Sequence, residues 1–441
     1  MSECLVSGID ANELARLYNT PLLVYDLDRV ARNYAMLKEA TGASIHYAVK
    51  ANGNLAVLTL LSGLGAGADV SSPGEIMLAE RAGFARGDVM LTGNFLSDDD
   101  ISYGINSGVT FNFDSLNSFR RAVRLGYRPG LVFFRLDVGY GKGESKGTTL
   151  AGEESKFGMF LSDALDAYRE AKRAGAERFG IQAMMGSNVL DADYFLGIGR
   201  RLKEQAEQIA DEAGVEFSYY DLGGGFGIPY RPGEEPLDLG KLRGLRDIFG
   251  GSLIVEPGRF LVGDAGYLLL RITEVKRKGS KVYVGVDAGM NVLMRPALYG
   301  SYHPMIACSG GEPVKVDVTG PICENTDRLA TDRELPLPKE GDLLIVLNAG
   351  AYVYSMSSNY NARPRPAEVV VSGGEHALAR RREGLEDLIR GSRVPRLVAS
   401  SLAAFRRGKA MFSALVSRHG AFRSRWHFLR KLLHMKSLYI N

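Results

Sequence analysis

A lysine, an acid and a run of glycines stand where they could act together on one small molecule. Lys50 closes the stretch "HYAVKAN", Glu256 lies in "EPGR", and glycines 223–225 form the centre of "DLGGGFG". A lysine amine can hold a carbonyl compound covalently, and glycines let backbone N–H groups approach a phosphate. Each also has an ordinary explanation: a strand-end lysine with its ammonium in water, a surface carboxylate and a tight turn. The elements that position them have to decide.

The chain alternates between short apolar or β-branched segments and amphipathic helical patterns from about residue 44 to 260. This alternation is typical of βα units around a parallel sheet, and the helical segments are long enough for crossover connections. Eight units predict an α/β fold, a closed (β/α)8 TIM-like barrel over residues 28–260. The expected strands are 44–50, 67–72, 88–93, 109–114, 131–137, 179–185, 219–225 and 252–258.

A second, mostly β domain is predicted over residues 261–390, because strand-like patterns replace the helical ones. Residues 1–27 are expected to contribute to it through the apolar run 21–27, which has no place among the eight barrel strands. A helical pattern is predicted at 376–391. The expected strands of this domain are 267–277, 281–289, 312–320, 341–350 and 367–373.

Polar residues stand at the carboxyl ends of the predicted barrel strands, where barrels of this type build their active sites. Asp69 lies in the second strand, Arg135 is near the end of the fifth, and Ser187 follows the sixth. Glu256 and Arg259 close the eighth. One such residue means little, but several of them predict a polar mouth.

The combination of a phosphate-binding loop, a lysine and a carboxylate at one mouth predicts pyridoxal phosphate. Lys50 would hold the cofactor covalently, and Glu256 would keep its ring nitrogen protonated so that the ring accepts electrons. The glycine run does not fit a dinucleotide fingerprint, because Ile228 stands where the third glycine should be.

With these residues in place, the chain resembles the fold type III pyridoxal-phosphate decarboxylases, most closely the diaminopimelate decarboxylases. The fold that this implies is alanine racemase/ornithine decarboxylase-like. The resemblance covers roughly residues 10–390 and rests on eight motifs in order: "YAVKAN", "GADVSSPGE", "SKFG", "DLGGGFG", "EPGR", "RPALYGSYH", "GPICENTD" and "NAGAYVYSMSSNYNARPRP".

The resemblance implies a cofactor site. Lys50 would carry the cofactor, Glu256 would bond the pyridine nitrogen, and Arg135 would face the phenolic oxygen of the ring. Ser187 and the glycines Gly223, Gly224 and Gly225 would cradle the phosphate. The other residues that it places around the cofactor are Asp69, Met184, Gly258, Arg259 and Tyr352.

The resemblance also implies a substrate site and a reaction, the conversion of meso-diaminopimelate to lysine and carbon dioxide. The distal carboxylate would be held by Arg259, Arg295 and Tyr299, with Tyr352 nearby. Glu324 would take the distal ammonium, and Cys323 would reach across a homodimer interface to protonate the product in a shared active site. Without the family, these residues would be surface charges, rim aromatics and a small buried hydrophobe.

One departure from the family falls in the sixth barrel strand. Members of the family usually have a "HCHIGS"-like segment with a histidine stacked on the cofactor, whereas "QAMMGS" places Gln182 and Met184 at the two histidine positions. Met184 could contact the ring through its sulfur or only pack the strand end. The departure leaves open a related specialised substrate, or a non-catalytic cofactor-binding regulator. Substrate length and stereochemistry are expected to depend on residues 138–155.

Composition narrows the remaining possibilities. The net charge is +3, but residues 391–441 hold 11 of the 54 basic residues and no acid, so the other 43 face 51 acidic residues, a net of −8. An acidic body argues against nucleic-acid binding. The basic tail, 391–441, resembles an amphipathic helix that could rest on an anionic membrane or a partner, or it could be a loosely ordered appendage or a helix packed on its own body.

The sequence predicts a cytoplasmic protein, since no run approaches 18 apolar residues and no signal-peptide pattern opens the chain. The three cysteines, Cys4, Cys308 and Cys323, predict a reducing compartment with no disulfide framework and no zinc site. No carboxylate spacing predicts another metal, and "SDDD" at 97–100 is expected to begin a helix.

Overall fold

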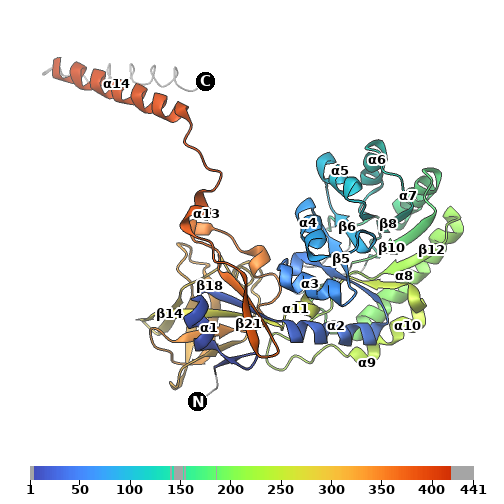
Figure 1. Cartoon of the computed structure of the whole chain (residues 1–441), viewed down its shortest axis with the longest axis horizontal. Helices are drawn as coiled ribbons and strands as arrows, with labels where there is room; N and C mark the ends of the chain where they lie inside the picture. The colour runs from blue at the N-terminus through green and yellow to red at the C-terminus, as the bar shows by residue number, and fades with distance from the viewer. Residues whose placement is uncertain (1–3, 140–141, 144–151, 153–154, 185, 419–441) are drawn as a thin grey trace. The chain divides into compact units, whose positions relative to one another are not determined.

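The computed structural model describes residues 4–139, 142–143, 152, 155–184 and 186–418. The chain divides into two compact units, residues 1–388 and 389–441. The larger unit contains a barrel and a β domain (Figure 1). No helix in the described ranges is long and apolar enough to cross a membrane.

The barrel is closed and entirely parallel, with its strands in sequence order around the ring. This confirms the predicted barrel, and each of the eight expected segments contains one strand or most of one. The strands are β4 (Ser44–Ala48), β5 (Gly67–Val70), β6 (Val89–Gly93), β7 (Thr110–Phe113), β8 (Leu131–Arg135), β10 (Arg178–Gln182), β12 (Phe217–Asp221) and β13 (Leu253–Val255).

Helices follow the strands and surround the barrel (Figure 1). Their starts are set by capping residues: Ser97 and Asp100 form a reciprocal capping box at α5, which confirms that residues 97–100 begin a helix. The barrel helices are α2 (Leu27–Thr41), α3 (Leu55–Gly63), α4 (Pro73–Ala82), α5 (Asp98–Ser107), α6 (Leu116–Arg124), α7 (Leu161–Arg173), α8 (Ala192–Ala213), α9 (Leu239–Leu242), α10 (Gly244–Phe249) and α11 (Arg259–Val262).

Side chains at alternate strand positions fill the barrel, apolar below and polar at the carboxyl end. A small cluster of Met90, Phe133 and Ile254 lies inside. Gly180 makes room for this layer, because a Cβ there would lie 2.2 Å from the Phe133 ring. Each of these strands carries a polar residue two positions further on, on the same face. Arg135 follows Phe133, Gln182 follows Gly180, and Glu256 follows Ile254. The period of two thus carries polar groups to the mouth.

The β domain is built on a nine-stranded sheet in the order β18-β17-β15-β14-β3-β20-β21, with β19 pairing β14 and β16 pairing β19. Residues 22–26 form β3, which lies between β14 and β20. The other strands are β14 (Gly266–Lys278), β15 (Lys281–Val286), β16 (Met305–Ala307), β17 (Pro313–Thr319), β18 (Arg328–Pro336), β19 (Leu343–Val346), β20 (Ala367–Ser372) and β21 (Glu375–Arg380).

The helix predicted at 376–391 is wrong for its first half. Residues 375–380 form β21, paired antiparallel with β20 through a two-residue turn at Gly373 and Gly374, both with positive φ. Such a turn favours a hairpin over the helical propensity of "HALAR". A short helix, α13 (Leu385–Ile389), follows.

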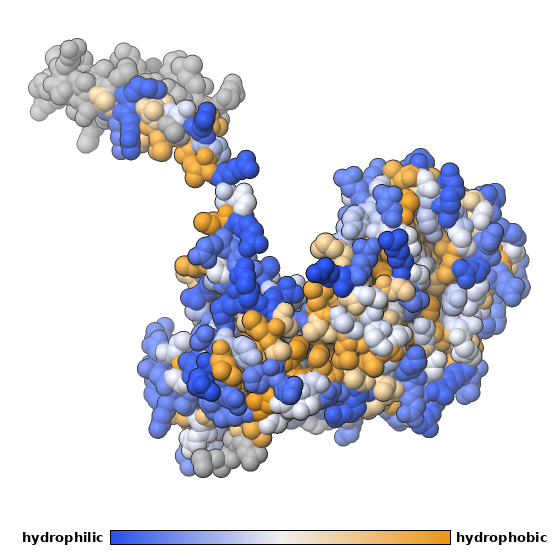
Figure 2. Space-filling view, viewed as in Figure 1, coloured by the Kyte–Doolittle hydropathy of each residue, from blue (hydrophilic) through white to orange (hydrophobic). Residues whose placement is uncertain are grey.

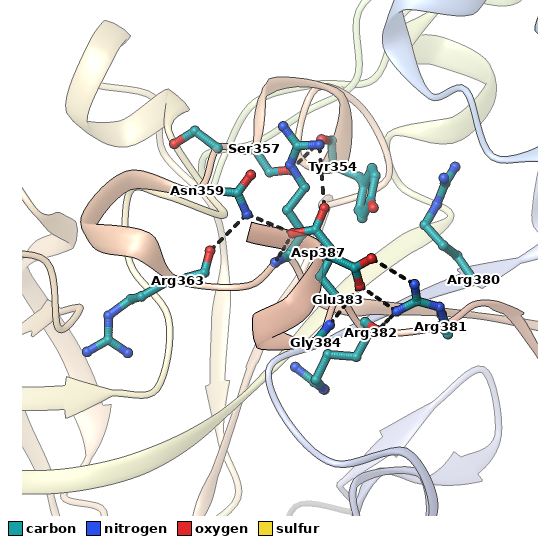
Figure 3. A network of polar contacts seen from close by, with 12 residues as sticks. Tyr354, Ser357, Asn359, Arg363, Arg380, Arg381, Arg382, Glu383, Gly384 and Asp387 are labelled. Carbon is teal, nitrogen blue, oxygen red and sulfur yellow. Dashed lines mark hydrogen bonds and ion pairs between the residues drawn. The ribbon is translucent and has the colours of Figure 1, made fainter. Parts of the chain in front are cut away.

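Polar contacts fasten the chain after β21 to the loop that follows the site residue Tyr352 (Figure 3). Glu383 accepts hydrogen bonds from the Asn359 amide at 2.7 Å and the Arg365 backbone N–H at 2.9 Å. Asp387 accepts from the Arg381 guanidinium at 2.6 and 2.9 Å. The end of the larger unit is thereby tied back to a segment beside the barrel mouth.

The N-terminal residues form β1 (Leu5–Val6), β2 (Ile9–Asp10) and α1 (Ala11–Tyr18). A disulfide joins Cys4 to Cys308, directly after β16, with the two Cα atoms 5.6 Å apart. The expectation of no disulfide is therefore wrong: the two cysteines are 304 residues apart, and sequence spacing does not reveal that the fold brings them together. Cys323 is free and exposed.

The described part of the smaller unit contains α14 (Arg396–Arg418). Its side chains Leu397, Val398, Leu402 and Phe405 are exposed, and Figure 2 shows hydrophobic and hydrophilic residues together on this helix. The predicted contact of the tail with a membrane or a partner stays a prediction, and residues 419–441 lie outside the described part.

Candidate active site

Lys50 lies in the 3-10 turn Val49–Ala51 that follows β4, at the carboxyl end of the barrel. Its Nζ is 3.3 Å from Oδ2 of Asp69, which lies on the neighbouring strand β5 and is 3% exposed. The Asp69 carboxylate raises the pKa of Lys50 above its ordinary value and outweighs the opposing loss of hydration, which is partial because the lysine side chain is 47% exposed. The amine is therefore held protonated beside a buried acid.

The floor of the mouth contains two more carboxyl groups, Asp221 at the end of β12 and Glu256 directly after β13. Both are buried, and burial raises the pKa of Asp221 to about 7 and that of Glu256 well above its ordinary value. Asp221 Oδ2 and Glu256 Oε1 have no hydrogen-bond donor within the described residues, and the two carboxyl groups lie close enough to share a proton, which acts to lower the pKa of Asp221. The floor is thus rich in acids and short of cations.

The residues at the two family histidine positions contact this floor. Gln182 is fully buried and donates from Nε2 to Glu256 Oε2 over 2.9 Å. The Met184 sulfur accepts the Gly224 N–H at 3.0 Å, and the Met184 carbonyl accepts from Arg135 at 3.3 Å. Met184 therefore sits against the glycine loop.

The glycine loop needs its glycines. Gly223 and Gly225 have positive φ, and the Gly223 N–H donates to Asp221 Oδ1 at 2.7 Å. A Cβ at Gly224 would lie 2.4 Å from the Glu256 carbonyl oxygen, so this residue has no room for a side chain.

Arg259 connects the glycine side of the mouth to the β domain. It is 6% exposed, and its Nη2 is 3.3 Å from Ser187 Oγ while its guanidinium lies 5.2 Å from the centre of the Tyr352 ring. Tyr352 has a positive φ of 59°, rare for a tyrosine, and its N–H donates to the Ala51 carbonyl at 2.8 Å. The β domain thus places an aromatic ring next to the Lys50 turn.

These side chains surround a small hollow at the mouth of the barrel. Nine of the site residues predicted from the sequence line the hollow, and a tenth, Asp69, accepts a hydrogen bond from Lys50. The lining residues are Ala48, Lys50, Met184, Ser187, Asn188, Gly224, Gly225, Phe226, Glu256, Gly258, Arg259 and Tyr352.

Arg135 and Gly223 lie behind this lining. Arg135 is buried, its guanidinium lies 4.5 Å from the centre of the Phe157 ring, and burial lowers its pKa. The carboxylates of Asp114, Glu256 and Asp69 oppose this lowering. Most of residues 138–155, expected to control substrate length, lie outside the described residues.

The residues predicted to bind the substrate do not all line the hollow. Arg295 is buried beside it: its Nη1 is 3.0 Å from His303 Nε2 and its guanidinium lies 5.0 Å from the Tyr230 ring. Tyr299 is half-buried, whereas Cys323 and Glu324 are exposed on the β domain. The Cys323 N–H donates to Asn361 Oδ1 at 2.7 Å.

Three residues of this neighbourhood escaped the sequence prediction. Tyr230 accepts from Arg259 at 2.9 Å and lies against Arg295, so it joins the two arginines. Burial lowers the pKa of His303 to about 3, which keeps it neutral and able to accept from Arg295. Asp221 could have been found as a charged strand end before the glycine run, but no spacing rule links Tyr230 to His303.

Pyridoxal phosphate fits the residues at this mouth. Glu256 offers a buried carboxylate oxygen that lacks a partner in the described chain, next to two further acids, and a protonated ring nitrogen would supply the missing positive charge. Lys50 lines the same hollow, and so do Ser187, Gly224 and Gly225, the donors suited to a phosphate.

Comparisons with known proteins agree with this geometry. Residues 27–263 match the family model described as "Pyridoxal-dependent decarboxylase, pyridoxal binding domain". The chain is 43% identical over 410 residues to a diaminopimelate decarboxylase of Methanothermobacter thermautotrophicus, covering 89% of this chain and 96% of that protein. A diaminopimelate decarboxylase of Thermoplasma acidophilum is 39% identical, with coverages of 87% and 96%.

Solved structures give the same result. The diaminopimelate decarboxylase of M. jannaschii superimposes with a TM-score of 0.81 at 33% identity, covering 89% of this chain and 96% of that one. The Helicobacter pylori diaminopimelate decarboxylase complexed with L-lysine gives 0.80 at 30% identity, with coverages of 86% and 98%.

Barrel, β domain and mouth together define an enzyme of the alanine racemase-like architecture with a pyridoxal-phosphate site. Within that class, the chain belongs to the pyridoxal-dependent decarboxylases. It is a lyase, and its cofactor is pyridoxal 5′-phosphate. This confirms the resemblance predicted from the eight motifs.

Proposed function

We propose that this enzyme converts meso-diaminopimelate to lysine and carbon dioxide. The observation that carries the proposal is the identity of 43% over 410 residues to a diaminopimelate decarboxylase, combined with a buried Glu256 opposite Lys50. Similar identities to several other diaminopimelate decarboxylases support it.

In this proposal, each residue of the mouth has a role toward the cofactor. Pyridoxal phosphate, when bound, would supply the electron sink that the loss of carbon dioxide from Cα requires. Lys50 would anchor the cofactor through its amine, and Glu256 would keep the pyridine nitrogen protonated. Arg135 would face the phenolic oxygen, while Ser187 and glycines 223–225 would hold the phosphate.

The distal end of the substrate needs one partner for each charge. Arg259, Arg295 and Tyr299 hold the carboxylate and Glu324 holds the ammonium, since each opposite charge must be paired once it leaves water. Tyr352 packs beside the cofactor and the substrate. The burial of Arg259 and Arg295 around Tyr230 supports the carboxylate side.

The proposal includes a cytoplasmic homodimer with shared active sites. Cys323 and Glu324 are exposed on the β domain, away from the lining of the hollow in their own chain. A second chain docked on this face would bring Cys323 of the partner subunit to the mouth, where its thiol returns a proton to Cα. This exposure supports the dimer.

Carbon dioxide release from four amino acids, measured in parallel, tests the proposal. The enzyme loaded with pyridoxal phosphate should decarboxylate meso-diaminopimelate to lysine and leave lysine, ornithine and carboxynorspermidine unchanged. Lys50→Ala should lose both turnover and the visible absorbance of the covalently held cofactor. Turnover of another of the four would indicate a related specialised pathway, and silence on all four with intact absorbance would favour a regulator or an untested substrate.

A further inference from the structure

Gln182 makes a contact with Glu256 that none of these roles uses. It is the last residue of β10, its side chain is fully buried, and its Nε2 donates to Glu256 Oε2 over 2.9 Å. Because β12 lies between β10 and β13, the two side chains meet across the end of a strand rather than along neighbouring strands. An amide in this position can hold one carboxylate oxygen in place.

Several charged groups act on the carboxyl group of Glu256. Burial first, then Asp221 and Asp69, raise its pKa, whereas Lys50 and the hydrogen bond from Gln182 lower it. Gln182 therefore favours the ionised form of Glu256 where most of the surroundings oppose it. The charged groups that face Glu256 are Asp69 on β5, Asp221 on β12, Lys50 after β4 and Arg135 on β8.

We propose that Gln182 is a positioning residue for Glu256: it holds Oε2 and keeps Oε1, as an ionised oxygen, available to the cofactor's ring nitrogen. A glutamine amide donates a hydrogen bond without adding a charge to a floor that already holds three carboxyl groups. Oε1 has no hydrogen-bond donor among the described residues, and Glu256 lines the hollow. The inference rests on the proposed function, which places that nitrogen beside Glu256.

Gln182→Met tests the inference, because methionine has a similar length and no donor. Without the hydrogen bond, Glu256 should take up a proton at a higher pH. The acid-side midpoint of the visible absorbance, recorded on cofactor-loaded enzyme without substrate, should rise by about one pH unit. The kcat should fall roughly tenfold at neutral pH with KM changed less than about twofold, because the contact acts on the transition state.

Two further variants separate the hydrogen bond from packing. Gln182→His offers an N–H donor at the same strand end and should move the midpoint and kcat back toward the wild-type values. Gln182→Asn keeps the amide but is one methylene too short, so it should shift both in the same direction as Gln182→Met. It also provides the test if Gln182→Met does not fold.

Glu256→Gln, measured in parallel, distinguishes a failure of this inference from a failure of the proposed function. If Glu256→Gln abolishes turnover while Gln182→Met and Gln182→Asn keep the wild-type midpoint and kcat, Gln182 only fills space and the inference is wrong. If Glu256→Gln itself leaves the absorbance and the turnover unchanged, the proposed role of Glu256 fails.

Discussion

At the scale of single residues, the mouth of the barrel is a place where acids are buried before a ligand arrives. Asp69, Asp221 and Glu256 are each at most 4% exposed. Lys50 pairs with Asp69, and Arg135 donates to the Met184 carbonyl. A protonated ring nitrogen would therefore offset the unfavourable burial and mutual repulsion of carboxyl groups in the cofactor-free protein.

Asp221→Asn should remove part of this unfavourable electrostatic energy. Burial raises the pKa of Asp221 to about 7, against an ordinary 3.8, so between these values the folded state binds more protons than the unfolded state. The free energy of unfolding of the cofactor-free protein then falls as the pH rises through this range. The free energy of unfolding of Asp221→Asn should exceed that of the wild type by roughly 2–4 kcal/mol at pH 8 and should equal it at pH 3. The asparagine side chain keeps an acceptor for the Gly223 N–H.

Chemical denaturation of the cofactor-free protein at several pH values measures this difference. Asp211→Asn, an exposed change on α8, is the matched control and should leave the dependence on pH as it is in the wild type. The explanation fails if wild type and Asp221→Asn lose stability equally between pH 5 and pH 8.

Single residues with a chemical signature were predictable from the sequence, and pairs were not. Lys50 and Glu256 stood out because several predicted barrel strands end in polar residues that share one mouth. The contact between Gln182 and Glu256 depends on two strands that are not neighbours, and the arginine pair around Tyr230 joins barrel to β domain. Such contacts come from the closed fold, which no local pattern encodes.

At the scale of elements, the glycine loop is the part of the site that has least room for an added side chain. Gly224→Ala would place a Cβ 2.4 Å from the Glu256 carbonyl oxygen, so the loop must move away from its place in the mouth. Such overpacking typically costs about 1–3 kcal/mol. The dissociation constant for pyridoxal phosphate, titrated into cofactor-free protein, should therefore rise roughly tenfold or more.

Gly197→Ala is the control for this change. Gly197 lies inside α8, and a Cβ added there would meet nothing within 4 Å beyond the backbone of its own helix. Alanine should therefore stabilise the helix by about 0.5–1 kcal/mol and leave cofactor affinity unchanged. Equal cofactor affinity in Gly224→Ala and Gly197→Ala would contradict the role given to the loop.

Element prediction worked where one rule governs and failed where two compete. The eight barrel strands were found because buried parallel strands are short apolar runs between helices. The segment 375–380 was missed because alanine, leucine and arginine favour a helix, while the glycine pair before it favours a hairpin. Pairing with β20 decides the outcome, since it gives the segment backbone partners that a short exposed helix would lack.

At the scale of the whole molecule, the disulfide between Cys4 and Cys308 ties the N-terminal segment to the β domain. The bridge closes a loop of 304 residues, and cross-links of this kind restrict the unfolded chain. In buffer without reductant, Cys308→Ser should lower the free energy of unfolding by about 2–4 kcal/mol. Denaturant titration of the oxidised proteins measures it.

Two comparisons assign that loss to the bridge. With a thiol reductant present, wild type and Cys308→Ser should have nearly equal stability, because neither chain is then cross-linked. Cys323→Ser removes the free, exposed cysteine and should leave the unfolding midpoint unchanged in either buffer. A wild-type protein whose stability does not respond to reductant would show that the bridge does not stabilise the fold, and packing around Cys4 and Cys308 would then have to hold the N-terminal segment.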